Sequence, residues 1–412
     1  MNNNRQMRYR SLLLLVAMVI PVLSSRLIQA DTGTCGGVSI TLPFMDVQAS
    51  NIFFCSIAEA YFSGLTNGTS MNTYNPSDPV PREQMAAFIT RTQDSALRRG
   101  NRRAAMQEWW TPTETGALRT VDLGGAAGGP TDIVFDGDDL WTANVFGGSV
   151  SRVHASDGRL TQTWDVAGVT TCVIAAAGRI FVGAGTGAST PGKIFAINPE
   201  ATTVGPVSVF ASDIGVNPQQ ITFDGANLWT ANTGNFTSGG SISRVQVATT
   251  IDSTFAAGFT APSDVLWDGA NLWVRDGTLK RVDTSSGVVL ESIAVGTGPH
   301  ELLFDGTNLW VTNFNSNSVS VVRATGNLRG TVLATLTGNG LGFPSGMAFD
   351  GERVLVCDSG SSSGAGAAVS LFKAADFTPL GSLSVPNDPV AAYYDGVNFW
   401  VARVNHNDIV RF

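Results

Sequence analysis

The sequence predicts a mainly β protein, a seven-bladed β-propeller that follows a small α-helical N-terminal module. Of its 412 residues, 46 are Gly and 17 are Pro, a composition typical of short strands joined by turns rather than of long helices. Only 14% of the residues are charged and 43% are hydrophobic, which indicates a folded chain and not a disordered one. A motif that returns at intervals of roughly 43 residues indicates a propeller.

The first 30 residues have the features of an export signal. Arg5, Arg8 and Arg10 precede an apolar stretch over residues 12–23, and Ala30 ends a segment that suits cleavage. The stretch is short for a membrane span, which favours a removed signal peptide over an uncleaved anchor. We therefore expect an exported protein, at the cell surface, in the periplasm or secreted, with no membrane span after cleavage.

Export also determines what we expect of the four cysteines. Cys35 and Cys55 lie close together in the small N-terminal segment, and we expect them to form a disulfide in an oxidising compartment. Cys172 and Cys357 fall in different strand patterns of the long C-terminal region. Each is expected to be a buried free thiol.

The charge balance excludes one class of partner. The chain has 33 acidic and 25 basic residues, a formal charge of −8, whereas a nucleic-acid-binding protein needs positive charge to displace counterions from phosphates. Histidine occurs at three positions only, and no Cys/His spacing typical of a metal site is present. We therefore expect no nucleic-acid partner and predict no Cys/His metal site.

The segment after the signal, residues 31–97, predicts a small helical module. Apolar residues recur at helical spacing over residues 52–62, and Gly64 follows as a C-cap. A second helix is expected over residues 81–89, with Pro81 in its first turn. Residues 98–117 are rich in Arg and are expected to form a linker to the large region.

Four short motifs of this module resemble, in order, one S-layer homology module. They are Phe44-Met45-Asp46-Val47, Gly64-Leu65-Thr66-Asn67-Gly68, Tyr74-Asn75-Pro76 and Val80-Pro81-Arg82-Glu83-Gln84-Met85-Ala86. The resemblance implies attachment to cell-wall polysaccharide, with Arg82 and Glu83 at the binding site. Two features depart from the family pattern, because the family usually binds with three modules and Pro81 replaces a Thr. The alternative is that Arg82 and Glu83 only cap the second helix.

Residues 118–412 contain seven copies of one repeat. Each full copy has a hydrophobic strand, an Asp-Gly turn and a second strand, with the Asp-Gly pairs at residues 136–137, 224–225, 268–269, 305–306, 350–351 and 395–396. A degenerate copy without the Asp, Ala176-Ala177-Gly178, fills the gap between the first two. Five of the nine Trp occupy the same repeat position. Their repetition favours packing between blades over an aromatic ligand cage.

The two ends of this region are expected to meet in one sheet. The last copy stops after its third strand, near residues 408–411, and residues 118–123 before the first copy have the pattern of an outer strand. We therefore expect residues 118–123 to complete the seventh blade. Such closure removes the open sheet edges that would otherwise promote aggregation.

Polar side chains gather where inner strands begin and second strands end. They are Asp132, Gln220, Asp264, His300 and Glu301 at the inner-strand starts, and Asn144, Asn232, Asp276, Asn313, Asp358 and Arg403 at the second-strand ends. We expect this ring to face the mouth of the central channel and to contact a small-molecule or protein ligand. Oxygen-rich rings can hold Ca²⁺ or Mg²⁺, although they also commonly just bind water. No motif requires a cofactor.

The repeat resembles two known groups of propellers. Leu309-Trp310-Val311-Thr312-Asn313 is similar to the bacterial repeat named for its Tyr-Val-Thr-Asn signature, and residues 118–412 resemble virginiamycin B lyase-like propellers. Gly298-Pro299-His300-Glu301 is similar to a lyase segment whose His contacts the substrate. The base His expected in the final blade is replaced by Asp388-Pro389-Val390, and a metal-binding Glu by Ala402-Arg403. Without these groups proton abstraction has no agent.

Two hypotheses of function follow. The favoured one is an exported, envelope-associated binding or structural protein without catalytic activity, in which the N-terminal module contacts the cell wall and the propeller is a recognition platform. The other is a metal-dependent lyase or lactonase that uses His300 and Glu301 at the channel mouth. Recognition of a protein partner on the broad face of the propeller fits the first hypothesis equally well.

Overall fold

In the computed structural model the chain forms two compact units, Met1–Ala96 and Leu97–Phe412. The residues that the structure describes are 31–35, 38–62, 66, 69–70, 72–80, 85, 119–124, 128–185, 187, 189–360, 366–385 and 388–412. The predicted signal peptide, the expected linker, Arg82 and Glu83 lie outside them. Among the described residues no helix has both the length and the apolar character needed to cross a membrane.

In its described residues the N-terminal unit combines a small sheet with the helix α1. β1 (Thr32–Cys35) and β2 (Val38–Thr41) pair antiparallel, and α1 spans Phe54–Phe62. The predicted α-helical character of the unit is not supported. β-Branched residues dominate β2 and favour an extended backbone. The second helix expected over residues 81–89 lies, apart from Met85, outside the described residues.

A disulfide and a compact apolar core stabilise the N-terminal unit. Cys35 and Cys55 form the predicted disulfide, which joins β1 to α1. The carboxylate of Asp46 accepts hydrogen bonds from the backbone N–H groups of Tyr74 (2.9 Å) and Asn75 (2.6 Å), so the segments around residues 46 and 74 meet. The buried core consists of Leu42, Phe44, Val47, Phe54, Ile57 and Ala58.

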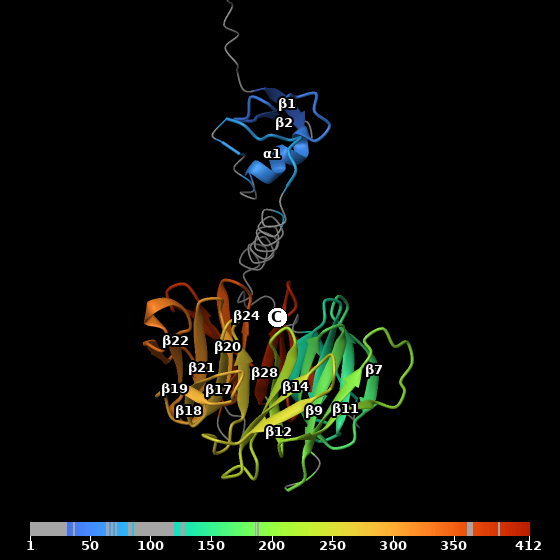
Figure 1. Ribbon diagram of the computed structural model, residues 1–412, viewed down its shortest axis with the longest axis vertical. Coiled ribbons are helices and arrows are strands. Elements are labelled where there is room, and N and C mark those ends of the chain that lie inside the picture. The colour runs from blue at the N-terminus through green and yellow to red at the C-terminus, as the bar shows by residue number, and fades with distance from the viewer. Residues whose placement is uncertain are drawn as a thin grey trace, which may run out of the picture. The chain divides into compact units, whose positions relative to one another are not determined.

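The second unit contains seven antiparallel sheets of four strands each (Figure 1). The inner strands are β4 (Pro130–Phe135), β8 (Val169–Ala176), β12 (Pro218–Phe223), β16 (Asp264–Trp267), β20 (Pro299–Phe304), β24 (Pro344–Phe349) and β28 (Pro389–Tyr394). The second strands are β5 (Asp139–Asn144), β9 (Arg179–Gly185), β13 (Asn227–Asn232), β17 (Leu272–Asp276), β21 (Asn308–Asn313), β25 (Arg353–Asp358) and β29 (Phe399–Arg403).

The outer half of each blade is built in the same way. The third strands are β6 (Ser149–His154), β10 (Gly192–Ile197), β14 (Ser241–Gln246), β18 (Thr278–Val282), β22 (Ser318–Arg323), β26 (Ala368–Lys373) and β30 (Asp408–Arg411). The outer strands are β7 (Arg159–Asp165), β11 (Ser208–Ile214), β15 (Asp252–Phe255), β19 (Val289–Ile293), β23 (Val332–Thr337), β27 (Pro379–Ser384) and β3 (Arg119–Asp122). Two short 3₁₀ helices lie in loops of the fifth blade, η2 (Phe314–Ser316) and η3 (Gly326–Leu328).

The blades form a closed ring. Each inner strand contacts the inner strands of both neighbouring blades, and β28 of the last blade contacts β4 of the first. β3 pairs antiparallel with β30, with Val121 opposite Ile409, so the chain start of this unit supplies the outer strand of the last blade. The prediction that residues 118–123 complete the seventh blade is confirmed.

The repeated Asp-Gly turn fastens the inner strand to the second strand. In the third blade Asp224 accepts a hydrogen bond from the backbone N–H of Asn227 (2.7 Å) and another from the indole Nε1–H of Trp229 (2.7 Å). Gly225 has φ +100°, in the left-handed region that favours glycine. The same Asp–Trp bond joins Asp136 to Trp141, Asp268 to Trp273, Asp305 to Trp310 and Asp395 to Trp400.

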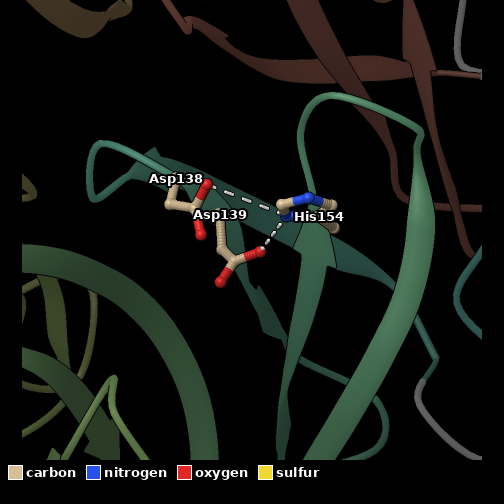
Figure 2. A group of neighbouring side chains, drawn as sticks. All are labelled: Asp138, Asp139 and His154. Carbon is tan, nitrogen blue, oxygen red and sulfur yellow. Dashed lines mark hydrogen bonds and ion pairs between the residues drawn. The ribbon is translucent and has the colours of Figure 1, made fainter.

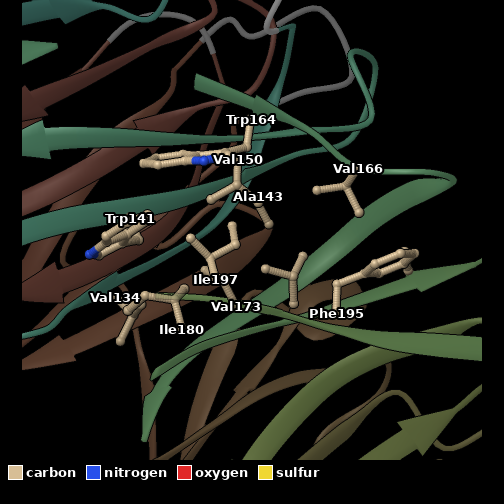
Figure 3. Packing of buried hydrophobic residues seen from close by; sticks show 12 residues of the cluster. Val134, Trp141, Ala143, Val150, Trp164, Val166, Val173, Ile180, Phe195 and Ile197 are labelled. Atoms are coloured by element: carbon tan, nitrogen blue, oxygen red, sulfur yellow. The ribbon is translucent and has the colours of Figure 1, made fainter. Parts of the chain in front are cut away.

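Neighbouring blades pack through the faces that carry these Trp residues. In the cluster between the first two blades, Trp141 and Trp164 stack with ring centroids 5.2 Å apart, beside Val173 and Phe195 of the second blade (Figure 3). All five repeat Trp side chains have an exposed fraction of 0%. The predicted role in blade-to-blade packing is therefore confirmed. Replacing a buried aromatic of this kind by Ala typically costs about 3–5 kcal/mol.

Candidate functional site

Every blade contributes to the lining of a cavity of about 310 Å³ at the end of the channel where the inner strands begin, and seven of the lining residues occupy one equivalent position of the repeat. These residues are Thr131, Thr171, Gln219, Ser263, His300, Ser345 and Val390. They stand at equivalent positions because each follows the first residue of the repeated inner-strand segment, which is Pro in six blades and Thr170 in the second. The mouth is thus a direct product of the repeat, with five kinds of side chain (Thr, Gln, Ser, His and Val) at its seven equivalent positions.

A second cavity of about 470 Å³ continues along the channel, lined by the inner strands of all seven blades. Asp132, Gln220, Asp264 and Glu301 line both cavities. Four of the side chains predicted at the mouth therefore lie together, between the mouth and the interior of the channel. His300 lines the mouth cavity beside them.

The three carboxyl groups of this level join neighbouring blades. Asp132 Oδ2 accepts a hydrogen bond from the backbone N–H of Val173 at 2.9 Å, and Asp264 Oδ2 accepts one from Leu302 at 2.6 Å. Glu301 Oε1 accepts one from the N–H of Met347 at 3.0 Å. In each case the donor belongs to the inner strand of the next blade, so each carboxyl group is held in place by the ring itself.

Burial makes these carboxyl groups hard to ionise. It raises the pKa of Asp132 to about 7 and that of Asp264 to about 6, and it raises the pKa of Glu301 well above its usual range, where the nearby charge of Asp264 adds to the effect. Near neutral pH the channel therefore retains protons on part of its carboxyl groups. A divalent cation bound here would have to displace those protons.

Two buried donors face the mouth without a partner. Among the described residues, neither Ser263 Oγ nor Arg275 Nε has a hydrogen-bond partner, and both residues line the mouth cavity. Burial lowers the pKa of Arg275, while the charges of Asp264, Asp276 and Glu301 oppose that shift. The guanidinium group remains charged at any ordinary pH.

His300 contributes a neutral aromatic ring. Its imidazole stacks on Phe314, with ring centroids 5.6 Å apart, and Phe314 in turn contacts Phe343 at 5.0 Å. The imidazole is exposed to the cavity, although protein atoms surround the rest of the side chain. This enclosure and the positive charge of Arg275 lower the pKa of His300 to about 4. The ring is therefore uncharged at neutral pH.

The six residues predicted at the second-strand ends do not line either channel cavity. Their side chains make hydrogen bonds or ion pairs within their own blades, one strand away from the channel. Asn144, Asn232 and Asn313 each donate to two Ser hydroxyls of the third strand. Asp276 pairs with Lys280, Asp358 accepts from Ser370, and Arg403 pairs with Asp408.

A separate group of possible metal ligands lies elsewhere in the first blade. Asp138, Asp139 and His154 bring ligand atoms close together (Figure 2). Asp139 is buried, and its two carboxylate oxygens already interact with the guanidinium of Arg152 and with His154 Nδ1, the latter at 3.0 Å. The group is explained as an ion-pair network that fixes β5 against β6.

Sequence reasoning missed Arg275, Ser263 and Phe314. The predicted site consists of acids and amides that recur at fixed positions of the repeat. Arg275 is instead a departure from the repeat, because it stands in the fourth blade where the first and third have Ala143 and Ala231, and this departure is visible in the sequence.

The sequence matches no known protein family and no curated protein. Solved structures similar to it include virginiamycin B lyase from Staphylococcus aureus, with 15% identity and a TM-score of 0.57 over 71% of this chain and 98% of that one. Hydrazine synthase of Kuenenia stuttgartiensis has 16% identity and a TM-score of 0.56 over 69% of this chain and 95% of that one. The Cps50 (Swd1) propeller domain of Myceliophteria thermophila has 10% identity and a TM-score of 0.56 over 71% of this chain and 97% of that one.

At these identities the comparisons show the fold alone. The second unit is a seven-bladed β-propeller, an architecture that serves many unrelated functions and is commonly a binding or recognition platform. The neighbours include enzymes, but the low identity establishes no activity for this chain in either direction. The resemblance of the N-terminal unit to an S-layer homology module is not shown by any family match.

Proposed function

We propose that this chain is an exported cell-envelope protein whose propeller is a recognition platform and whose channel mouth binds the ligand. The observation that carries the proposal is the mouth cavity, in which side chains of five kinds, at one equivalent position of each of the seven blades, surround about 310 Å³. A cavity of this size lies in the range of small-molecule pockets. Such a site can discriminate among ligands because its equivalent positions carry hydroxyl, amide, imidazole and alkyl side chains.

The state of the acidic groups favours binding over catalysis. Asp132, Asp264 and Glu301 each hydrogen-bond the next blade, so moving one of them to serve a reaction would weaken the ring. In the final blade Val390 takes the position that His300 takes in the fifth. An alkyl side chain there offers no base for proton abstraction.

We propose further that the N-terminal unit attaches the protein to cell-wall polysaccharide, with Arg82 and Glu83 at the contact. The support is the order of the chain, in which an export signal precedes a module that resembles the S-layer homology family. Deleting residues 35–99 should move the protein from the wall fraction to the soluble fraction, and Arg82→Ala should weaken sedimentation with purified walls. Arg91→Ala, in the same unit but outside the motif, is the matched control. Unchanged retention after the deletion would refute the anchor.

A second candidate function is a metal-dependent lyase or lactonase at the same mouth. The observation in its favour is that His300 lines one cavity with Asp132, Asp264 and Glu301. Calorimetric titration with Ca²⁺ and with Mg²⁺ tests it, using the unaltered chain and Glu301→Gln. Binding that the variant loses would favour the enzyme, whereas the absence of binding at millimolar metal would remove it.

A further inference from the structure

We propose that the channel mouth binds an organic carboxylate, whose negative charge is met by the guanidinium group of Arg275 and the hydroxyl of Ser263. The inference rests on the proposed function and names the chemical class of the ligand. It depends on two places where the fourth blade departs from the pattern that the other blades share, and both departures face one cavity.

The first departure is Arg275 itself. The residue before the last of the second strand, or its structural equivalent opposite the inner strand, is small in all other blades: Ala143, Gly183, Ala231, Thr312, Cys357 and Ala402. A small side chain there leaves room for the neighbouring inner strand. The propeller therefore does not need an Arg at this position, and a role in folding does not explain it.

The guanidinium of Arg275 is also short of partners. Among the described residues it makes no hydrogen bond and no ion pair, and its Nε is fully enclosed. Asp264 lies opposite Arg275 in the strand pair, but its Oδ2 is bonded to the N–H of Leu302. A guanidinium has five N–H donors, and buried donors without acceptors are rare because each costs about 1–3 kcal/mol. The terminal N–H groups of the guanidinium are not enclosed in this way, so a ligand that supplies acceptor oxygens can pair with them and compensate the buried positive charge.

The second departure is the hydroxyl of Ser263. Three other blades carry a hydroxyl at the same position of the mouth ring, and each reaches the backbone of the next blade. Thr131 Oγ1 donates to the carbonyl of Thr171 and Thr171 Oγ1 to that of Pro218, while Ser345 Oγ donates to that of Pro389. Ser263 Oγ has no partner among the described residues. It is adjacent to Arg275, whose carbonyl accepts the backbone N–H of Ser263 at 3.1 Å.

The surroundings select the kind of anion. Asp132, Asp264 and Glu301 line the same cavity, so a ligand with two negative charges would meet three carboxyl groups and a single cation. A carboxylate has one charge and two oxygens in a plane, which matches the fork of N–H donors of an Arg. The stacked rings of His300 and Phe314 provide a flat wall for the apolar body of the molecule. The site thus suits a small aromatic or apolar monocarboxylate.

Benzoate and its neutral isostere benzamide test the inference. Both are titrated into the whole chain by ligand-observed NMR, together with Arg275→Gln and Ser263→Ala. We expect benzoate to bind at least tenfold more tightly than benzamide. Arg275→Gln should lower the affinity for benzoate by about 10–100-fold, because it removes a charged hydrogen-bonded pair. Ser263→Ala removes a hydroxyl that makes no hydrogen bond in the fold, so it should weaken benzoate by a few fold and leave the thermal midpoint unchanged.

Arg281→Gln is the matched control, because Arg281 lies in the same blade and pairs with Glu291 outside the two channel cavities. It should leave benzoate affinity unchanged. Equal affinity for benzoate and benzamide, or benzoate binding that survives both Arg275→Gln and Ser263→Ala, overturns the carboxylate assignment. Benzylamine separates this result from failure of the proposed function. If benzylamine or benzamide binds and His300→Ala weakens it, the mouth is still a ligand site, whereas no binding of any of the three refutes both ideas.

Discussion

At the scale of single residues, one hydrogen bond explains why the repeat keeps its Asp and its Trp. The indole N–H of Trp229 is buried with a side chain of 0% exposure, and its acceptor is Asp224 Oδ2 at 2.7 Å. In the sixth blade the Trp is absent, and Arg353 takes over by donating from Nε to Asp350 at 2.7 Å. In these six blades the constant element is therefore a carboxylate that ties the turn to the second strand, and only the second blade, with Ala176-Ala177-Gly178, lacks it.

Breaking this bond should destabilise the propeller by a measurable amount. Asp224→Ala leaves the buried indole N–H of Trp229 without an acceptor, and we expect a loss of about 1.5–3 kcal/mol in the free energy of unfolding. Trp229→Phe keeps most of the packing but removes the donor. Denaturant unfolding of both single variants and the double variant measures the coupling. Strictly additive losses would show that the bond contributes nothing.

A second residue-scale prediction concerns the pH dependence of stability. Burial raises the pKa of Asp132 to about 7 in the folded chain, from its ordinary value of 3.8. Between these values the folded state holds a proton that the unfolded state releases, so this contribution to stability is complete below pH 4 and lost as pH rises through 7. Asp264, with a pKa of about 6, acts in the same direction.

We therefore expect the thermal midpoint to be lower at pH 7.5 than at pH 5.5, by about 2–4 °C, because the raised pKa values of the three carboxyl groups outweigh the lowered pKa of His300, which acts in the opposite direction. Asp132→Asn keeps an acceptor for the N–H of Val173 but cannot ionise, so it should make the profile flatter. Asp252→Asn, at an exposed position of an outer strand, is the control. A profile that is as steep in Asp132→Asn as in the unaltered chain would contradict the assignment.

At the scale of elements, the sequence predicted the strands that belong to the repeat and missed the strands β1 and β2, which lie outside it. Six Asp-Gly turns and five Trp residues predicted where the blades lie. Because the last copy of the repeat lacks an outer strand, residues 118–123 were expected to supply it. β1 and β2 are four residues each, too short to stand out as an alternating pattern. Asn144 was expected at the mouth because its position along the strand was right. Its amide instead donates to Ser149 and Ser151 within the blade. The spacing of residues along a strand does not show how far a side chain lies from the channel.

The disulfide should matter to the N-terminal unit alone. Cys35 and Cys55 are 20 residues apart, and closing a loop of that length removes chain entropy equivalent to about 3 kcal/mol at 25 °C. The described core of this unit has only six buried residues, so the unit should lose much of its protection when both cysteines are changed to Ser. Hydrogen exchange followed by mass spectrometry would report the change in α1. Cys172→Ala, at a buried free thiol of the propeller, should leave the exchange of α1 unaltered.

At the scale of the whole molecule, the mouth exists because the ring is closed. The seven side chains that surround the cavity belong to seven blades, so any opening between β28 and β4 would separate Val390 from Thr131. Closure and site are thus linked physically, and the identity of the site residues is free to differ from blade to blade. This freedom also explains why the period of the repeat predicted the fold in detail but did not predict Arg275, which is an exception to the repeat.

Removing the closing strand tests this link. β3 contributes Val121 and is followed by Leu123, both buried in the cluster between the last and first blades. A chain that begins at residue 124 leaves β30 with an unpaired edge and loses this burial, worth about 1.5–3 kcal/mol per side chain. We expect it to have a markedly lower thermal midpoint and to aggregate, while a chain that begins at residue 112 stays monomeric. A synthetic peptide of residues 117–124 should restore part of the stability by pairing with β30. If the two chains melt at the same temperature and both stay monomeric, closure by β3 does not hold the ring together, and the mouth must owe its shape to the inner strands alone.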